Sequence, residues 1–265
     1  MKKLHFAKTA LLTLLVPGLG HLYNGHAARG IFFFFVCNIV YYGSIYAGVI
    51  YTTIGLFACV FVYLTIILYV IYDANAISSK HDHTKQTWYA KLIYGIIYFS
   101  LATIFTIYID SFSFVPKQFH TPSSSMGNTL IIGDTALIDL TAYDTNHPEY
   151  DDIIVFVFPE DETKHFIKRV IGKPGDIVCI ENKQVFVNGQ KRVEDYTMHT
   201  SKEHQKRRDT MPPMTIPPDT YFVLGDNRDE SYDSRFFGPV AKEKIIGKAR
   251  IIIWSDRWSR IGKTL

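Results

Sequence analysis

Residues 31–72 read IFFFFVCNIVYYGSIYAGVIYTTIGLFACVFVYLTIILYVIY and contain no charged side chain. As one helix this run would be roughly 63 Å long, about twice the hydrocarbon thickness of a bilayer. It therefore predicts a helical hairpin that turns near Tyr51, Thr52 and Thr53, with spans at about 31–50 and 54–72. A second charge-free stretch, 92–109, predicts a third span. The alternative, a buried helical core in a soluble protein, needs amphipathic partner helices that the remaining sequence lacks.

The first apolar stretch, residues 10–16, is too short to span and is interrupted by Pro17-Gly18. Three lysines precede it, as in a secretory signal peptide, but a spanning hairpin follows almost at once. We therefore expect residues 9–23 to form a short interfacial or re-entrant helix. If this segment crosses the membrane instead, either the N-terminus lies outside or the orientation below reverses.

The basic residues predict which side of the membrane each segment faces. They cluster at the N-terminus and in residues 73–91, which carry Lys80, Lys85 and Lys91, whereas the turn near Thr52 has none. Because basic loops stay in the cytoplasm, residues 1–110 become a membrane region and residues 111–265 an extracytoplasmic domain. Phe112, Phe114 and Phe119 would anchor that domain at the interface.

The composition excludes some classes of function. A net charge of +3 and a pI near 8.6 are too mild for nucleic-acid binding. Only Cys179 lies in the polar half, so no intramolecular disulfide is expected there. The tripeptide His81-Asp82-His83 could hold a metal, although such a loop segment is more often simply solvated, and we expect neither a metal nor a cofactor.

After Asp110 the apolar runs become short and alternate, which is typical of strands. Residues 190–218 are polar, basic and interrupted by prolines, which predicts a loop or small cap. An all-β domain follows from this pattern, with strands at residues 135–140, 153–158, 165–171, 176–180, 184–187, 221–224 and 245–254.

Three segments of this domain could carry chemistry. The first, Pro122-Ser123-Ser124-Ser125-Met126, reads most simply as a Ser-rich linker if taken alone. In the second, strand alternation places Lys168 on one face with Phe166 and Val170. Burial there would lower the lysine pKa and make the amine a base, whereas a strand-edge lysine in water would keep its charge.

The third segment is the acidic stretch 225–238, GDNRDESYDSRFFG. Its carboxylates suggest calcium, but the loop lacks the glycine of a calcium-binding loop, and Arg228 and Arg235 lie among the candidate ligands. A turn held by carboxylate–guanidinium pairs is the alternative.

In order and spacing, these three segments resemble the characteristic boxes of bacterial type I signal peptidases, a family with a serine–lysine dyad. The resemblance implies a membrane-anchored β-barrel-like domain that removes signal peptides from exported preproteins. It implies Ser125 as nucleophile, Lys168 as general base, and Ser123 with the Ser125 amide as oxyanion hole. The further implied roles are lysine orientation for Ser231, a structural charge pair for Asp233 and Arg235, and substrate binding for Pro122, Met126, Leu130, Phe166 and Ile167.

The resemblance places the chain in the bacterial inner membrane as a multi-pass protein, with its catalytic domain on the periplasmic side. The expected partners are signal peptides and the lipid bilayer, with the secretion translocon as a further candidate. Two positions depart from the family pattern. Asn128 stands where the family usually has proline, and Asp151 stands where glycine commonly precedes Asp152.

Three other functions remain open at this point. A Ser-His-Asp hydrolase would use His120, His147 or His165, but none lies in a supporting motif. A specialised relative would mature one pilin-like substrate rather than serve general export. A membrane scaffold would bind exported segments without cutting them.

Overall fold

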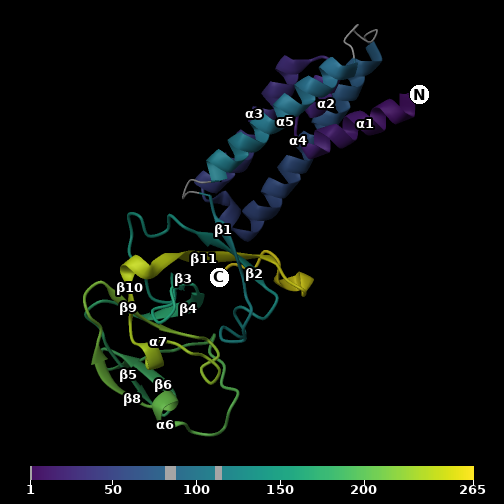
Figure 1. The fold of residues 1–265 in the computed structure, drawn as a ribbon. Helices are drawn as coiled ribbons and strands as arrows, with labels where there is room; N and C mark the ends of the chain where they lie inside the picture. Colours follow the sequence, from purple (N-terminus) through teal and green to yellow (C-terminus); the bar gives the residue numbers. More distant parts are fainter. Residues whose placement is uncertain (1, 81–87, 111–114) are drawn as a thin grey trace. The chain divides into compact units, whose positions relative to one another are not determined.

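The computed structural model of the chain describes residues 2–80, 88–110 and 115–265. It has two compact units, Met1–Val115 and Pro116–Leu265, each of which is described by itself (Figure 1). The tripeptide His81-Asp82-His83 and the predicted anchors Phe112 and Phe114 lie outside the described residues.

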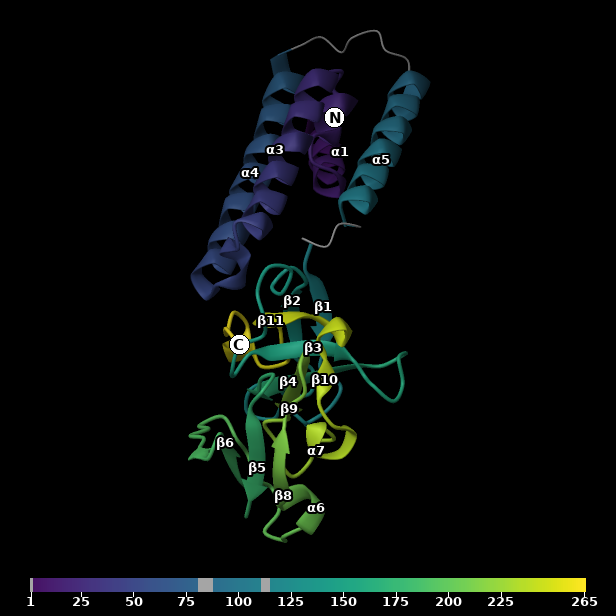
Figure 2. The ribbon, with the colours of Figure 1, turned by 90° about the vertical axis from the view of Figure 1, so that its left-hand side faces the viewer.

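The first unit is helical. Figure 2 shows α3 and α4 running side by side, joined by the short 3-10 turn η1, which matches the predicted hairpin. Within the described residues, Ala27–Tyr46 and Thr53–Ala76 are long and apolar enough to cross a membrane, whereas Gly95–Phe105 counts only as a shorter apolar helix. The elements are α1 (Lys2–Leu15), α2 (Leu19–Tyr23), α3 (Ala27–Tyr46), η1 (Val49–Tyr51), α4 (Thr53–Lys80) and α5 (Trp88–Asp110).

The predicted segment 9–23 consists of two helices separated by a sharp turn. Gly18 has a φ of 90°, and a Cβ there would lie 2.0 Å from the carbonyl oxygen of Gly30. Glycine is therefore required for α2 to pack this closely against α3. His21, fully buried, places its Nε2 2.9 Å from a carboxylate oxygen of Asp73, which ties α2 to α4.

The second unit contains a seven-stranded antiparallel sheet in the order β1-β2-β11-β3-β4-β9-β10. The prediction of a barrel-like domain is wrong in one respect. The sheet is open, because the edge strands β1 and β10 each pair with one neighbour in the described chain. The strands are β1 (Lys117–His120), β2 (Thr135–Asp139), β3 (Ile153–Val157), β4 (His165–Gly172), β9 (Thr220–Leu224), β10 (Val240–Ala241) and β11 (Ile245–Trp254).

A separate four-stranded sheet, ordered β7-β6-β5-β8, lies at one end of this unit (Figure 2). Residues 190–218, predicted as a loop or a small cap inserted between strands, contain β7, α6 and β8, and β8 pairs with β5 from before the segment. Pro212 and Pro213 argue against a strand in the sequence, yet both fit here because β8 is an edge strand. The elements are β5 (Ile177–Glu181), β6 (Gln184–Val187), β7 (Gln190–Lys191), α6 (Lys206–Asp209) and β8 (Met211–Thr215).

Strand β4 is the element that positions the candidate site. It pairs with β3 along residues 165–169, but with β9 only from Arg169 onward. Its side chains enter the hydrophobic clusters on both faces of the sheet: Ile167 packs with Met126 and Leu130, and Val170 packs with Ile154. The edge of residues 165–168 that faces β9 therefore has no strand partner in the described chain.

Candidate active site

Ser125 and Lys168 lie in direct contact. The Lys168 Nζ is 2.9 Å from the Ser125 Oγ, and the amine also donates to the main-chain oxygen of Ile167 at 2.9 Å. Ser125 comes from the loop before β2, and Lys168 from the middle of β4. A serine hydroxyl and an amine at this distance can exchange a proton.

Lys168 is shielded from water, with 4% of its surface exposed. Its amine lies 5.3 Å from the centre of the Phe166 ring, which stacks on Phe158 at 4.3 Å. Burial lowers the pKa of Lys168 from 10.5 to about 8, while the negative charges of Asp233 and Asp226 oppose this shift. Strand alternation left burial and exposure of Lys168 open, and the structure has the buried case. Near pH 8 much of the amine is therefore neutral and basic.

The loop that carries Ser125 is held by its hydrophobic neighbours. Met126 and Leu130 are fully buried in one cluster with Ile167. The Gly127 amide donates to the Ser124 carbonyl, and the Leu130 amide to the Met126 carbonyl, which closes two tight turns. Ser125 itself is 7% exposed. The core thus fixes the serine in place.

The other residues predicted for the oxyanion hole and for substrate binding lie around the pair. Pro122 and Ser123 are exposed, and the Ser123 Oγ is 3.2 Å from the Ser125 Oγ. Phe166 is half-buried, so its ring is partly accessible beside the open edge of β4. Met126, Leu130 and Ile167 are core residues in this structure, and they would meet a substrate only if it reached into that core.

The predicted charge pair is present in full. The guanidinium of Arg235 donates two hydrogen bonds to Asp233, at 2.8 Å each, and both residues are buried. Asp233 also accepts from the Gly225 amide, which connects the pair to the end of β9. The turn is therefore held by carboxylate–guanidinium pairing, as the alternative to calcium predicted.

Ser231, predicted to orient the lysine, has a buried hydroxyl with no hydrogen-bond partner among the described residues. It makes no hydrogen bond to Lys168 in this structure, and the orienting role stays a prediction. The oxygen packs against Gly225 instead, where an added Cβ would lie 2.2 Å from it.

Neither the histidine nor the calcium alternative is supported. His120 and His147 contact Thr135 and Lys242, respectively, and His165 is exposed. No group of three or more His, Cys, Asp or Glu side chains in the described parts of the chain is placed to hold a metal.

Comparison with known proteins identifies the family. The family model described as "Signal peptidase, peptidase S26" matches residues 92–254, which is more than half of the chain. This chain belongs to the signal peptidase S26 family. The probable signal peptidase I-2 of Synechocystis sp. is 37% identical over 161 residues, which cover 58% of this chain and 71% of that protein. Signal peptidase I of Leptolyngbya laminosa is 36% identical over 171 residues, which cover 62% of this chain and 80% of that protein.

Two further matches each cover a part of the chain. A solved signal peptidase I from Enterococcus faecalis V583 is 30% identical and covers 39% of this chain and 97% of its own, with a TM-score of 0.34. A second family model, of unknown function, matches residues 8–147 and so includes the helical unit. The resemblance to type I signal peptidases is confirmed, and the chain is a serine peptidase of that family. Family membership supports the removal of signal peptides as its function.

At the two positions that depart from the expected family pattern, Asn128 and Asp151, the backbone has a positive φ. Asn128 has a φ of 73°, which proline cannot adopt because its ring holds φ near −65°. The turn after Ser125 therefore differs here from one built with proline. Asp151 has a φ of 67°, in the region that glycine enters most easily.

Sequence reasoning missed the ion pair between Arg169 and Asp226. The Arg169 Nε and one terminal nitrogen donate to the two Asp226 oxygens at 2.9 and 2.7 Å, and both residues are buried. Asp226 also accepts from Thr129 in the serine loop. The signal in the sequence was an arginine directly after Lys168 and a carboxylate two residues after the strand expected at 221–224, but nothing in the sequence paired the two.

Proposed function

We propose that the chain is a membrane-anchored endopeptidase that removes signal peptides with Ser125 as nucleophile and Lys168 as general base. The observation that carries this proposal is the 2.9 Å contact between the Ser125 hydroxyl and an amine that is almost fully buried. A charged lysine could not accept the serine proton, whereas a desolvated one with a pKa of about 8 can.

The reaction follows from this contact. The Ser125 proton moves to Lys168 Nζ while Oγ attacks the carbonyl carbon before the scissile bond. The resulting oxyanion accepts hydrogen bonds from the Ser125 amide and the Ser123 hydroxyl, each worth about 3 kcal/mol in enzymes of known mechanism. When the C–N bond breaks, Lys168 returns the proton to the leaving amine. A water molecule deprotonated by Lys168 then hydrolyses the acyl-enzyme ester.

An extended substrate segment would bind along the free edge of β4. Among the described strands none pairs with residues 165–168 on the side of β9, and an added peptide strand would pair with the main chain there. This edge ends at Lys168, next to Ser125. The Phe166 ring and the Ile167 main chain are therefore proposed to lie beside the substrate, as the family resemblance implies.

Membrane anchoring is part of the proposal. The two helices Ala27–Tyr46 and Thr53–Ala76 are long and apolar enough to span, and α5 is proposed as the third span. With three spans, the positive-inside rule places Pro116–Leu265 on the periplasmic side of a bacterial inner membrane. The lipid bilayer is then a partner, and the secretion translocon stays a prediction.

The proposal is tested with the full chain reconstituted in vesicles and a synthetic signal-peptide substrate analysed by mass spectrometry. Ser125→Ala and Lys168→Ala should leave the peptide intact, whereas the wild type should give two fragments. Ser259→Ala and Lys164→Ala, at exposed positions elsewhere in the unit, are matched controls that should retain cleavage. Full activity of either dyad variant would remove that residue from the mechanism, and binding without cleavage by the wild type would favour a scaffold.

A further inference from the structure

In the acidic loop that follows β9, one carboxylate has no cationic partner in the part of the chain that the structure describes. Three of its carboxylates are neutralised: Asp226 by Arg169, Asp229 by Lys183 and Arg208, and Asp233 by Arg235. Glu230, which is exposed, accepts hydrogen bonds only from neutral groups among the described residues. Its negative charge is therefore uncompensated locally.

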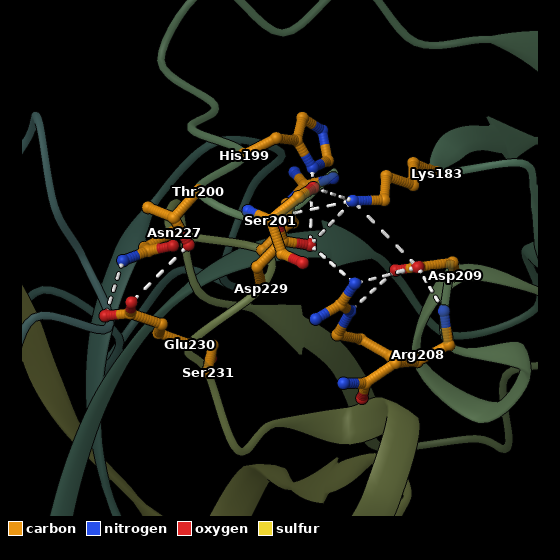
Figure 3. Close-up of polar contacts among 12 residues, drawn as sticks. Lys183, His199, Thr200, Ser201, Arg208, Asp209, Asn227, Asp229, Glu230 and Ser231 are labelled. Carbon is orange, nitrogen blue, oxygen red and sulfur yellow. Dashed lines mark hydrogen bonds and ion pairs between the residues drawn. The ribbon is translucent and has the colours of Figure 1, made fainter. Parts of the chain in front are cut away.

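Glu230 lies next to the nucleophile loop. One of its carboxylate oxygens accepts from the Ser124 hydroxyl at 2.9 Å and from the side-chain amide of Asn227 at 3.3 Å. The other oxygen accepts from Thr200 at 3.4 Å. Figure 3 shows the contacts of Glu230 with Asn227 and Thr200 set apart from the ion pairs that surround Asp229. The uncompensated charge of Glu230 is thus hydrogen-bonded to Ser124, the residue directly before Ser125.

The course of β4 indicates which part of a substrate passes this charge. A peptide on the free edge of residues 165–168 cannot continue along β4, because β9 occupies the edge from Arg169 onward. It must leave the sheet near Lys168, where Ser125 meets the scissile bond. The loop that leads out of β9 occupies this point, since the main-chain amide of Asn227 donates to the Ser125 carbonyl at 3.1 Å. We take the peptide to run parallel to β4, with the residues before the cut along residues 165–168, so that the residues after the cut pass Glu230.

We propose that Glu230 sets a charge preference for the substrate residues just after the cleavage site, favouring basic and disfavouring acidic side chains there. This inference rests on the proposed function, because it takes Ser125 as the point of cleavage. A unit charge at roughly 8 Å in a half-solvated site changes a rate about fivefold, and salt weakens such an effect.

The experiment uses the full chain and signal-peptide substrates with Lys, Gln or Asp at the first or second residue after the cut. The wild type should show a kcat/KM for the Lys peptides about fivefold or more above that for the Asp peptides, falling with added salt. Glu230→Gln should bring this ratio close to one, and Glu230→Lys should invert it. Glu243→Gln, which removes one exposed carboxylate elsewhere in the unit, should keep the wild-type ratio.

A ratio measured within one enzyme does not depend on how much of that enzyme is folded, so a purely structural role of Glu230 would not change it. No charge preference in the wild type, or a ratio unchanged in Glu230→Gln, would overturn the inference even if every variant were unstable. Ser125→Ala separates the two proposals. If Ser125→Ala still cleaves, the proposed function fails. If Ser125→Ala is inactive and the Lys-to-Asp ratio is the same in the wild type and in Glu230→Gln, only the charge preference fails.

Discussion

The Lys168 amine lies 2.9 Å from the Ser125 hydroxyl, although 43 positions separate them in the sequence. Each has a chain neighbour in the same hydrophobic cluster, Met126 beside the serine and Ile167 beside the lysine. The core that stabilises this end of the sheet therefore also sets the distance between the two reacting groups. Small changes in that core should act on catalysis as well as on stability.

The pH dependence of cleavage should follow the protonation of Lys168. Since the neutral amine is the base and its pKa is about 8, kcat/KM should rise through pH 8 and reach a plateau about one unit higher. Peptide cleavage measured from pH 6 to pH 10 checks this. A rate already at its plateau at pH 6.5 would contradict a lysine base with this pKa.

Replacing the lysine should stabilise the protein at neutral pH. At pH 7 the buried ammonium destabilises the fold by about 3 kcal/mol, the energy equivalent of a pKa lowered from 10.5 to about 8. Lys168→Met, which keeps most of the volume, should be inactive yet have a higher Tm in detergent. The unfolded state binds more protons between pH 8 and 10.5, so wild-type stability rises there and the advantage should shrink. A Met variant that melts earlier at pH 7 would argue that Lys168 is hydrated.

Gly225→Ala should abolish most of the activity. A Cβ at this position would lie 2.2 Å from the Ser231 hydroxyl oxygen and 2.5 Å from the Ser125 carbonyl oxygen, and the latter is main chain that cannot rotate away. The nucleophile loop must therefore shift. Gly95→Ala in α5, where an added Cβ meets nothing within 4 Å, is the control and should cleave at the wild-type rate. Equal kcat/KM for the two variants would show that the loop tolerates the shift.

Asp226→Asn should destabilise the domain by about 3 kcal/mol, because it leaves the buried guanidinium of Arg169 without its charged partner. It also removes a negative charge that raises the pKa of Lys168, so the rise of kcat/KM should move to lower pH. Thermal melting and the pH profile measure the two effects. Asp144→Asn, at an exposed position, should change stability by less than about 0.5 kcal/mol.

The proposed topology has a direct test. A protease-sensitive tag inserted between residues 80 and 88 should resist protease added to spheroplasts, while a tag at the C-terminus should be digested in the same preparation. This follows from three spans with basic loops in the cytoplasm. Digestion of the internal tag on sealed spheroplasts would contradict this orientation.

Several elements could be predicted because they depend on local patterns. The absence of charge in residues 31–72 predicted the α3–α4 hairpin, and strand alternation predicted β6 and β11 with their observed ends. The prediction failed for β8, because Pro212 and Pro213 are compatible with a strand only at a sheet edge, and edges are defined by which strands pair. The barrel-like closure failed for the same reason.

In the candidate site, too, some features could be predicted from the sequence and others depended on the tertiary structure. The resemblance of the three segments to signal peptidase boxes singled out Ser125 and Lys168, whereas strand alternation left open whether Lys168 is buried. Only the tertiary structure brought the amine to the hydroxyl, left the Ser231 oxygen without a partner among the described residues, and paired Arg169 with Asp226. Periodicity and charge act between neighbours along the chain and so are readable from the sequence, whereas these contacts join segments tens of residues apart, and their distances depend on how the whole core packs.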